Sequence, residues 1–338
     1  MPGKIRTSFL LLVAAFSASI TLCITSTAGA QSTHLAPPHL GMRGRSVPAV
    51  QEPARAGDVP AVQNPNTSIG NFGLIDFPGS TGSVAIGIND KGQIVGGYDG
   101  SDVLSNPAHS FVLKGSTFKT INYPNAISTE ANAINDEGTV VGYYTDASNN
   151  VHGFKFSGST YTAIDHPGAV QPVGTVVWGI NNLGEIVGGY SNGTTVSGFL
   201  LSNGSYSDIY FPGSTYTAAL GINKAGQIVG WYGDSSGNVN GFLYDHGSYT
   251  TLDYPGFPEG YAEGINDNGQ IVGGYGNFGT LAWQHGFLYQ NGQFTSIDAP
   301  FGPAVITLPG TINNHGNITG TYQDATGTWY GFVATVTK

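Results

Sequence analysis

The chain has 338 residues, of which 40% are hydrophobic and only 9% are charged, and its formal net charge is −10. That much apolar material is enough to bury a core. All four arginines precede residue 56 and only six lysines follow it, so the rest of the chain cannot neutralise phosphates by counterion release. With this net negative charge and few basic residues, we expect neither nucleic acid nor anionic membranes as partners.

The first segment, residues 1–30, has the layout of a secretory signal peptide. Lys4 and Arg6 precede an apolar run over residues 9–24, and small residues follow at 28–30. We therefore expect an exported, secreted or periplasmic protein. The single cysteine, Cys23, lies in this segment, so the mature chain is expected to carry no disulfide. No other apolar run approaches the roughly 20 residues needed to span a bilayer.

The next segment, residues 31–66, is rich in Pro, Ala and Gln and has no apolar periodicity. This composition is typical of a flexible linker. The remaining residues, 67–338, are predicted to form one repeat domain.

That domain contains six copies of one motif, which reads GINDKGQIVGGY at residues 87–98. The copies align on a constant asparagine and are spaced 42 to 47 residues apart, at Asn89, Asn135, Asn181, Asn223, Asn266 and Asn313. This period is typical of a propeller blade or a solenoid unit.

Within each copy, the residues after the asparagine predict a turn and a strand. Glycine stands three residues after it, Ile or Val five after, glycine seven after and Tyr nine after. The asparagine and the first glycine suit a tight reversal. The other three share one face of a strand, because side chains alternate with a period of two. The glycine at seven predicts that a neighbouring sheet presses on the backbone there.

Two more strands complete each copy. One is built around a phenylalanine: Phe111, Phe154, Phe199, Phe242, Phe287 and Phe332. The other carries Ile75, Ile121, Ile164, Ile209, Leu252 and Ile297, and a proline follows each by three residues. Proline ends the strand because it cannot donate to a ladder. Six repeats of four short strands predict an all-β fold, a six-bladed β-propeller of four-stranded antiparallel blades.

The ends of the domain predict closure of the ring. A strand around Ile75 precedes the first motif, whereas the chain stops soon after the strand around Phe332. We expect the N-terminal strand to pair with the last blade, which removes an exposed sheet edge.

The repeats resemble the HAF-type extracellular repeat family of bacterial secreted proteins. The resemblance rests on segments such as GINDKGQIVGGY, HGFLY and TSIDAPFG and covers about residues 70–338. It implies export and a repeat β architecture. It implies no established activity and no catalytic residues.

Function is expected where the copies differ, because binding residues are grafted onto a constant scaffold. One variable slot, three residues before the asparagine, holds Ile86, Asn132, Trp178, Leu220, Glu263 and Gly310. A second, eight residues after it, holds Gly97, Tyr143, Gly189, Trp231, Gly274 and Thr321. The predicted ligand-binding residues are Asn132, Trp178, Glu263, Tyr143, Trp231 and Glu130, the rings stacking on sugars and the polar groups bonding hydroxyls. In the alternative interpretation, Trp178 and Trp231 only fill gaps between blades.

Metal ligands are not predicted. Asp90, Asp136 and Asp267 follow the constant asparagine, as in oxygen-rich calcium loops, but Lys224 fills the same slot in the fourth copy. The polar residues eleven after the asparagine are interpreted as caps of their own turns: Asp146, Asn192, Asp234, Asn277 and Asp324. Three histidines, His109, His152 and His285, share one slot and should be spread around the ring. No cofactor is expected.

These observations favour a secreted, non-enzymatic binding propeller for a polysaccharide or a cell-surface partner, expected to be a monomer. One alternative is a carbohydrate-active hydrolase or lyase, with acids drawn from Glu130, Glu185, Glu259 and Glu263 placed roughly 5 to 10 Å apart. The other is a structural envelope protein without a soluble ligand.

Overall fold

The computed structural model describes residues 67–98, 109–277, 282–302 and 304–337. These ranges contain 24 β-strands and no helix, so they contain no helix long and apolar enough to cross a membrane. The predicted signal peptide and linker lie outside the described residues.

Four sheets contain four antiparallel strands each, in chain order from the axis outward. The first contains β2 (Ser83–Ile88), β3 (Ile94–Tyr98), β4 (His109–Lys114) and β5 (Thr117–Ile121). The second contains β6 (Ser128–Ile134), β7 (Val140–Thr145), β8 (Val151–Ser157) and β9 (Thr160–Ile164). The third contains β10 (Thr175–Ile180), β11 (Ile186–Ser191), β12 (Val196–Ser202) and β13 (Ser205–Ile209). The fourth contains β14 (Tyr216–Ile222), β15 (Ile228–Gly233), β16 (Val239–Asp245) and β17 (Ser248–Leu252).

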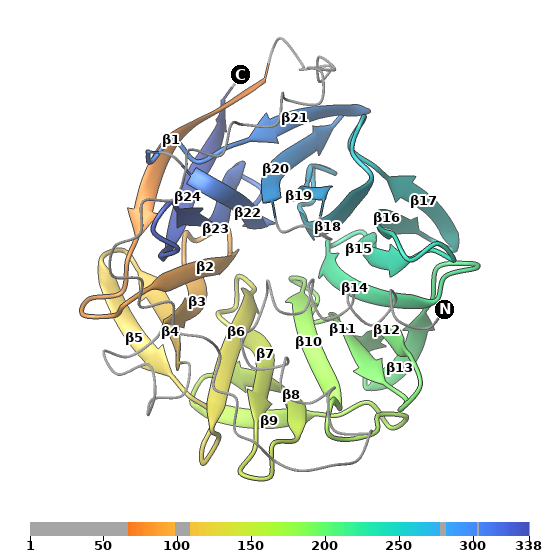
Figure 1. Cartoon of the computed structure of the whole chain (residues 1–338). Helices are drawn as coiled ribbons and strands as arrows, with labels where there is room; N and C mark the ends of the chain where they lie inside the picture. Colours follow the sequence, from red (N-terminus) through yellow and green to blue (C-terminus); the bar gives the residue numbers. More distant parts are fainter. Residues whose placement is uncertain (1–66, 99–108, 278–281, 303, 338) are drawn as a thin grey trace, which may run out of the picture.

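The remaining eight strands form one sheet made of two antiparallel groups. One group contains β18 (Glu259–Ile265), β19 (Ile271–Asn277), β20 (Ala282–Gln290) and β21 (Gln293–Ile297). The other contains β22 (Ala304–Ile312), β23 (Asn317–Asp324), β24 (Trp329–Thr337) and β1 (Ser68–Ile75). A single parallel pair, Gln284 with Ile306, joins the groups. The structure is thus an all-β propeller of four-stranded antiparallel blades, whose first strands β2, β6, β10, β14, β18 and β22 surround the centre (Figure 1).

The predicted pairing of the N-terminal strand is present. β1 lies antiparallel to β24, from Ser68 opposite Thr337 to Ile75 opposite Gly331. Although the two strands are far apart in sequence, they lie side by side at the rim (Figure 1). The expected strand around Ile75 therefore forms the outer edge of the group that begins with β22.

The core lies between neighbouring blades. All six constant phenylalanines are fully buried, as expected for packing residues. Most clusters join neighbouring blades; for example, Val95 of the first blade packs with Phe154 and Ile134 of the second. Burying a side chain of this size stabilises the fold by about 1.5–3 kcal/mol, so the ring depends on repeated contacts of one kind.

Every inner strand carries a β-bulge, which the sequence analysis did not predict. The register shifts between Ala85 and Gly87 in β2, and at the equivalent place in the other five inner strands. The bulge brings inner strands against one another around the axis. A Cβ added to Gly87 would lie 2.7 Å from the carbonyl oxygen of Asn132, and one added to Gly221 would lie 2.8 Å from that of Glu263. Small residues at this position are therefore required by contact between blades.

The glycine seven after the asparagine is constant for a reason other than the one predicted. A Cβ on Gly142 would collide with the Glu130 carbonyl oxygen, and one on Gly230 with that of Ala218. Both oxygens belong to the paired inner strand of the same blade. The prediction of a neighbouring sheet at this glycine is wrong, because the bulge turns the partner strand's own carbonyl group toward it.

Candidate functional site

One end of the axis is closed by a ring of asparagines. Each constant asparagine donates its Nδ2 hydrogen to the backbone carbonyl oxygen of the next one, and the sixth bond returns from Asn313 to Asn89. Its Oδ1 meanwhile accepts from the backbone N–H four residues later, as Asn89 does from Gln93. The glycine three residues on has positive φ, as the turn prediction requires; Gly92, for example, has φ 69°. Both polar atoms of these side chains are thus hydrogen-bonded, and the side chains hold neighbouring repeats together.

A second ring surrounds a small cavity of about 80 Å³ at the same end. In five repeats the side chain after the asparagine accepts from the backbone N–H of the preceding repeat, as Asp136 does from Asp90 and Asp267 does from Lys224. Lys224 cannot accept, so it breaks this ring at one link. The described residues include no group of three or more His, Cys, Asp or Glu side chains placed to hold a metal ion.

The six predicted ligand-binding residues lie on the inner and second strands, and most are buried. Tyr143, Trp231, Asn132 and Glu263 are each at most 6% exposed, whereas Trp178 and Glu130 are partly exposed. Trp178 packs against the cluster of Trp231 and also against the cluster of Tyr143. The Asn132 amide donates to the Val177 carbonyl oxygen in the next blade at 2.8 Å.

In the third blade the two variable slots share one packing space, and in others the second slot packs against the residue five before the asparagine. The rings of Trp178 and Tyr261 cover Gly189 and Gly274, since added Cβ atoms would lie 2.8 Å and 2.6 Å from them. In other blades the large ring comes from the second strand instead. Trp231 faces Ala218 there. Filling of gaps therefore accounts for much of the variation in these slots.

Glu263 is a buried carboxyl on the bulge of β18. Burial raises its pKa from 4.5 to about 8, because removal from water disfavours the charged form. The other predicted acids do not converge with it. Glu185 bonds the Asn181 amide and the Ser202 hydroxyl at the asparagine end, whereas Glu259 begins β18 at the opposite end. The four acids do not form one carboxylate pair.

The opposite end of each blade, which we call the loop face, contains the loops between second and third strands and the linkers to the next blade. Columns of rings lie here. Tyr123 of a linker stacks on Tyr144 with centroids 3.6 Å apart, and His152 stacks on the other side at 5.1 Å. Tyr254, Tyr275 and His285 repeat the arrangement at 3.7 Å and 5.4 Å.

The linker aromatic residue was missed by the sequence analysis. It stacks on the constant tyrosine in five blades: Phe77, Tyr123, His166, Phe211 and Tyr254. A signal was present, because each of these residues directly precedes the linker proline. The stack joins the linker to the blade that it enters.

Histidine and carboxylate groups line these columns. His152 Nδ1 lies 3.0 Å from Asp165 Oδ1, and His285 Nδ1 lies 2.6 Å from Asp298 Oδ1. Burial opposes ionisation of Asp298, but hydrogen bonds from His285 and Ser296 outweigh it and lower its pKa. As predicted, the three histidines of this slot serve separate blades, since His109 meets Asn122 of its own blade at 2.9 Å.

Asp146, Asn192, Asp234 and Asp324, eleven after the asparagine, cap their own turns, as expected; the turn after Asn277 lies outside the described residues. Asp146 accepts from the backbone N–H groups of Ser148 and Asn150, and Asp234 accepts equivalent bonds. The hydrogen bond from the Asn150 backbone is the largest cause of the lowered pKa of Asp146.

Comparison with known proteins gives a fold and no family. No family model and no curated protein matches the chain. Among solved structures, a lectin of Aleuria aurantia in complex with Fucα1-6GlcNAc is similar at 12% identity and a TM-score of 0.50, over 79% of this chain and 97% of that one. A mutant of AofleA from Arthrobotrys oligospora is similar at 10% identity and a TM-score of 0.50, over 79% and 86%. A protein of unknown function from Dyadobacter fermentans is similar at 10% identity and a TM-score of 0.52, over 81% and 99%. At these identities the likeness shows the propeller fold alone.

Proposed function

We propose that the protein is a secreted, non-enzymatic carbohydrate-binding module, built as a six-bladed propeller of HAF-type repeats and closed by β1. The blade count is supported by the six-membered asparagine ring and by the two four-stranded groups of the eight-stranded sheet. Export is supported by the sequence of residues 1–30.

The observation that carries the proposal is the repeated edge of aromatic rings, histidines and carboxylates on the loop face. The partly exposed imidazoles of His152 and His285, and not the buried ring of Tyr275, offer a surface to a sugar, and the carboxylates beside them bond its hydroxyls. Repetition around a disc offers several binding sites, which together raise avidity. The partly exposed Trp178 and Glu130 are further candidate contacts nearer the axis. The fucose-containing ligand of the Aleuria lectin supports a saccharide as the class of ligand.

A glycan array probed with labelled residues 67–338 tests the proposal. We expect at least one saccharide to bind, with no change in its length after prolonged incubation. His285→Ala should weaken binding, because its imidazole is partly exposed on the loop face, whereas Tyr289→Ala, near the other end of the same blade, should leave it unchanged. Shortened products that disappear in Glu263→Gln would establish the hydrolase or lyase instead, and a silent array would favour the structural role.

A further inference from the structure

The loop face is acidic, and its carboxylates stand without the lysines that accompany those of the asparagine end. The residue after the outer strand is aspartate in four repeats: Asp76, Asp165, Asp253 and Asp298. The turn between second and third strands adds Asp146, Asp234 and Asp324. Among the described residues, the lysines lie in the turns of the asparagine end or within strands β4, β5 and β8, and no arginine occurs. The described part of this face therefore carries no Lys or Arg to balance its carboxylates.

Exposed apolar side chains also occur on this face. Four of the large apolar residues that are at least 40% exposed lie in the linkers between blades: Ile127, Val170, Tyr210 and Phe257. Each stands in a different linker, so the four are spread around the face and do not form one patch. Val170 and Phe257 lie in the same linkers as two of the aspartates.

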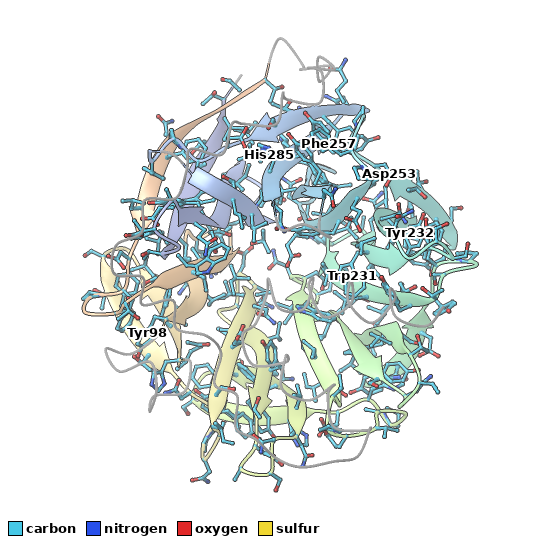
Figure 2. The ribbon with its side chains drawn as sticks, viewed as in Figure 1. Tyr98, Trp231, Tyr232, Asp253, Phe257 and His285 are labelled. Atoms are coloured by element: carbon cyan, nitrogen blue, oxygen red, sulfur yellow. The ribbon has the colours of Figure 1, made fainter. Side chains whose placement is uncertain are left out.

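The two features are closest together at the linker between β17 and β18. Asp253, Phe257 and Glu259 lie within one short segment, and the Asp234 loop of the preceding blade is near them. Burial raises the pKa of Asp253, and the carboxylate of Asp234 raises it further. The Phe257 ring is 42% exposed and stands edge-on to Tyr275, with centroids 4.7 Å apart. Figure 2 shows Asp253, Phe257 and His285 in this sector, outside the axial Trp231.

We propose that the loop face, centred on Asp253, Phe257 and Glu259, is selective for cationic saccharides, meaning amino-sugar polymers whose amines are free. This inference rests on the proposed function and names its ligand class. An ammonium group relieves the repulsion between neighbouring carboxylates, and the C–H face of the sugar ring covers Phe257. Anionic polysaccharides are repelled by the same charges.

The test compares two probes of equal length, a glucosamine hexamer and its fully N-acetylated form, by calorimetry at low and high salt. We expect the free-amine hexamer to bind about tenfold more tightly at low salt, a preference that fades as salt screens the charges. Asp253→Asn should reduce that preference. Its matched control is Asp245→Asn, the same charge change in a hairpin at the asparagine end.

Each outcome decides a different claim. Equal binding of the two hexamers without salt dependence overturns the cationic selectivity and leaves the carbohydrate module intact. If neither hexamer binds but the glycan array detects other saccharides, the cationic selectivity is overturned and the carbohydrate-binding function stands. If no saccharide binds at all, the proposed function fails. Hexalysine that binds as tightly as the glucosamine hexamer would replace the sugar with a basic protein partner. Loss of binding to both hexamers in Phe257→Ala, with loss of discrimination alone in Asp253→Asn, supports the assignment.

Discussion

The buried carboxyl of Glu263 gives the clearest consequence at the scale of one residue. Its pKa is about 8 in the folded protein, against an ordinary 4.5, so the folded state holds a proton that the unfolded chain has lost between these pH values. Folding stability should therefore fall as pH rises through this window, and the full penalty should be present above pH 8.

Glu263→Gln removes this penalty while keeping the shape of the side chain. We expect a higher free energy of unfolding at pH 8, by on the order of a few kcal/mol, and little change near pH 4. Urea unfolding at several pH values measures it. Glu137→Gln, on an exposed turn, is the control. An unchanged pH slope in Glu263→Gln would show that the carboxyl reaches solvent or a partner.

Single residues also show where prediction from sequence stopped. The burial of Phe154 and its equivalents, and the positive φ of Gly92, follow directly from a constant residue in a periodic strand. The burial of Trp231 fits the alternative that it fills a gap between blades, but the burial of Tyr143 was not predicted, because the bulge places slots from two strands against one another. The aligned repeats do show that the large Trp178 and the small Gly189 occur in the same copy. Without the bulge, however, the sequence does not indicate that these two residues are in contact.

At the scale of elements, β1 completes the last blade. Its Ile75 packs with Ala85, Ile88 and Phe111 of the first blade, so the strand also joins the two ends of the ring. Ile69 and Phe72 pack on the cluster of Phe332. The strand was predictable because its isoleucine and proline match the other five repeats.

Deleting residues 68–75 should therefore destabilise the whole domain. Three apolar side chains at about 1.5–3 kcal/mol each approach the total stability of a typical domain, so the loss should be about 5 kcal/mol or more. Thermal unfolding measures it as a steep fall in Tm. Deletion of residues 58–65, of equal length and before the strand, is the control. An equal Tm in the two deletions would contradict closure by β1.

At the scale of the whole molecule, the asparagine ring connects every repeat to the next. Asn223 donates to both Gln227 Oε1 and the Asn266 carbonyl oxygen, and it accepts from the Gln227 backbone. The constant asparagine was correctly assigned to a turn from sequence. Its bond across blades was not predicted, because a contact between repeats leaves no trace within one repeat.

Asn223→Ala should cost about 1–3 kcal/mol, because it leaves buried polar groups without partners. Asn240→Ala, at a partly exposed strand position, should change stability by less than about 0.5 kcal/mol. Tryptophan fluorescence and far-UV circular dichroism should still report one coincident transition, because a closed ring has no terminal repeat to melt first. Separate transitions for the two probes would contradict that coupling.

The meeting of β1 and β24 also fixes where attachments leave the domain. Ser68 and Thr337 touch through their hydroxyl groups, 2.6 Å apart, so both ends of the described fold emerge together at the edge of the disc. Segments joined before or after it are therefore attached at the rim of the disc and not at its axis. The same adjacency makes circular permutation feasible, with a short connector across these ends and new termini cut into any exposed turn.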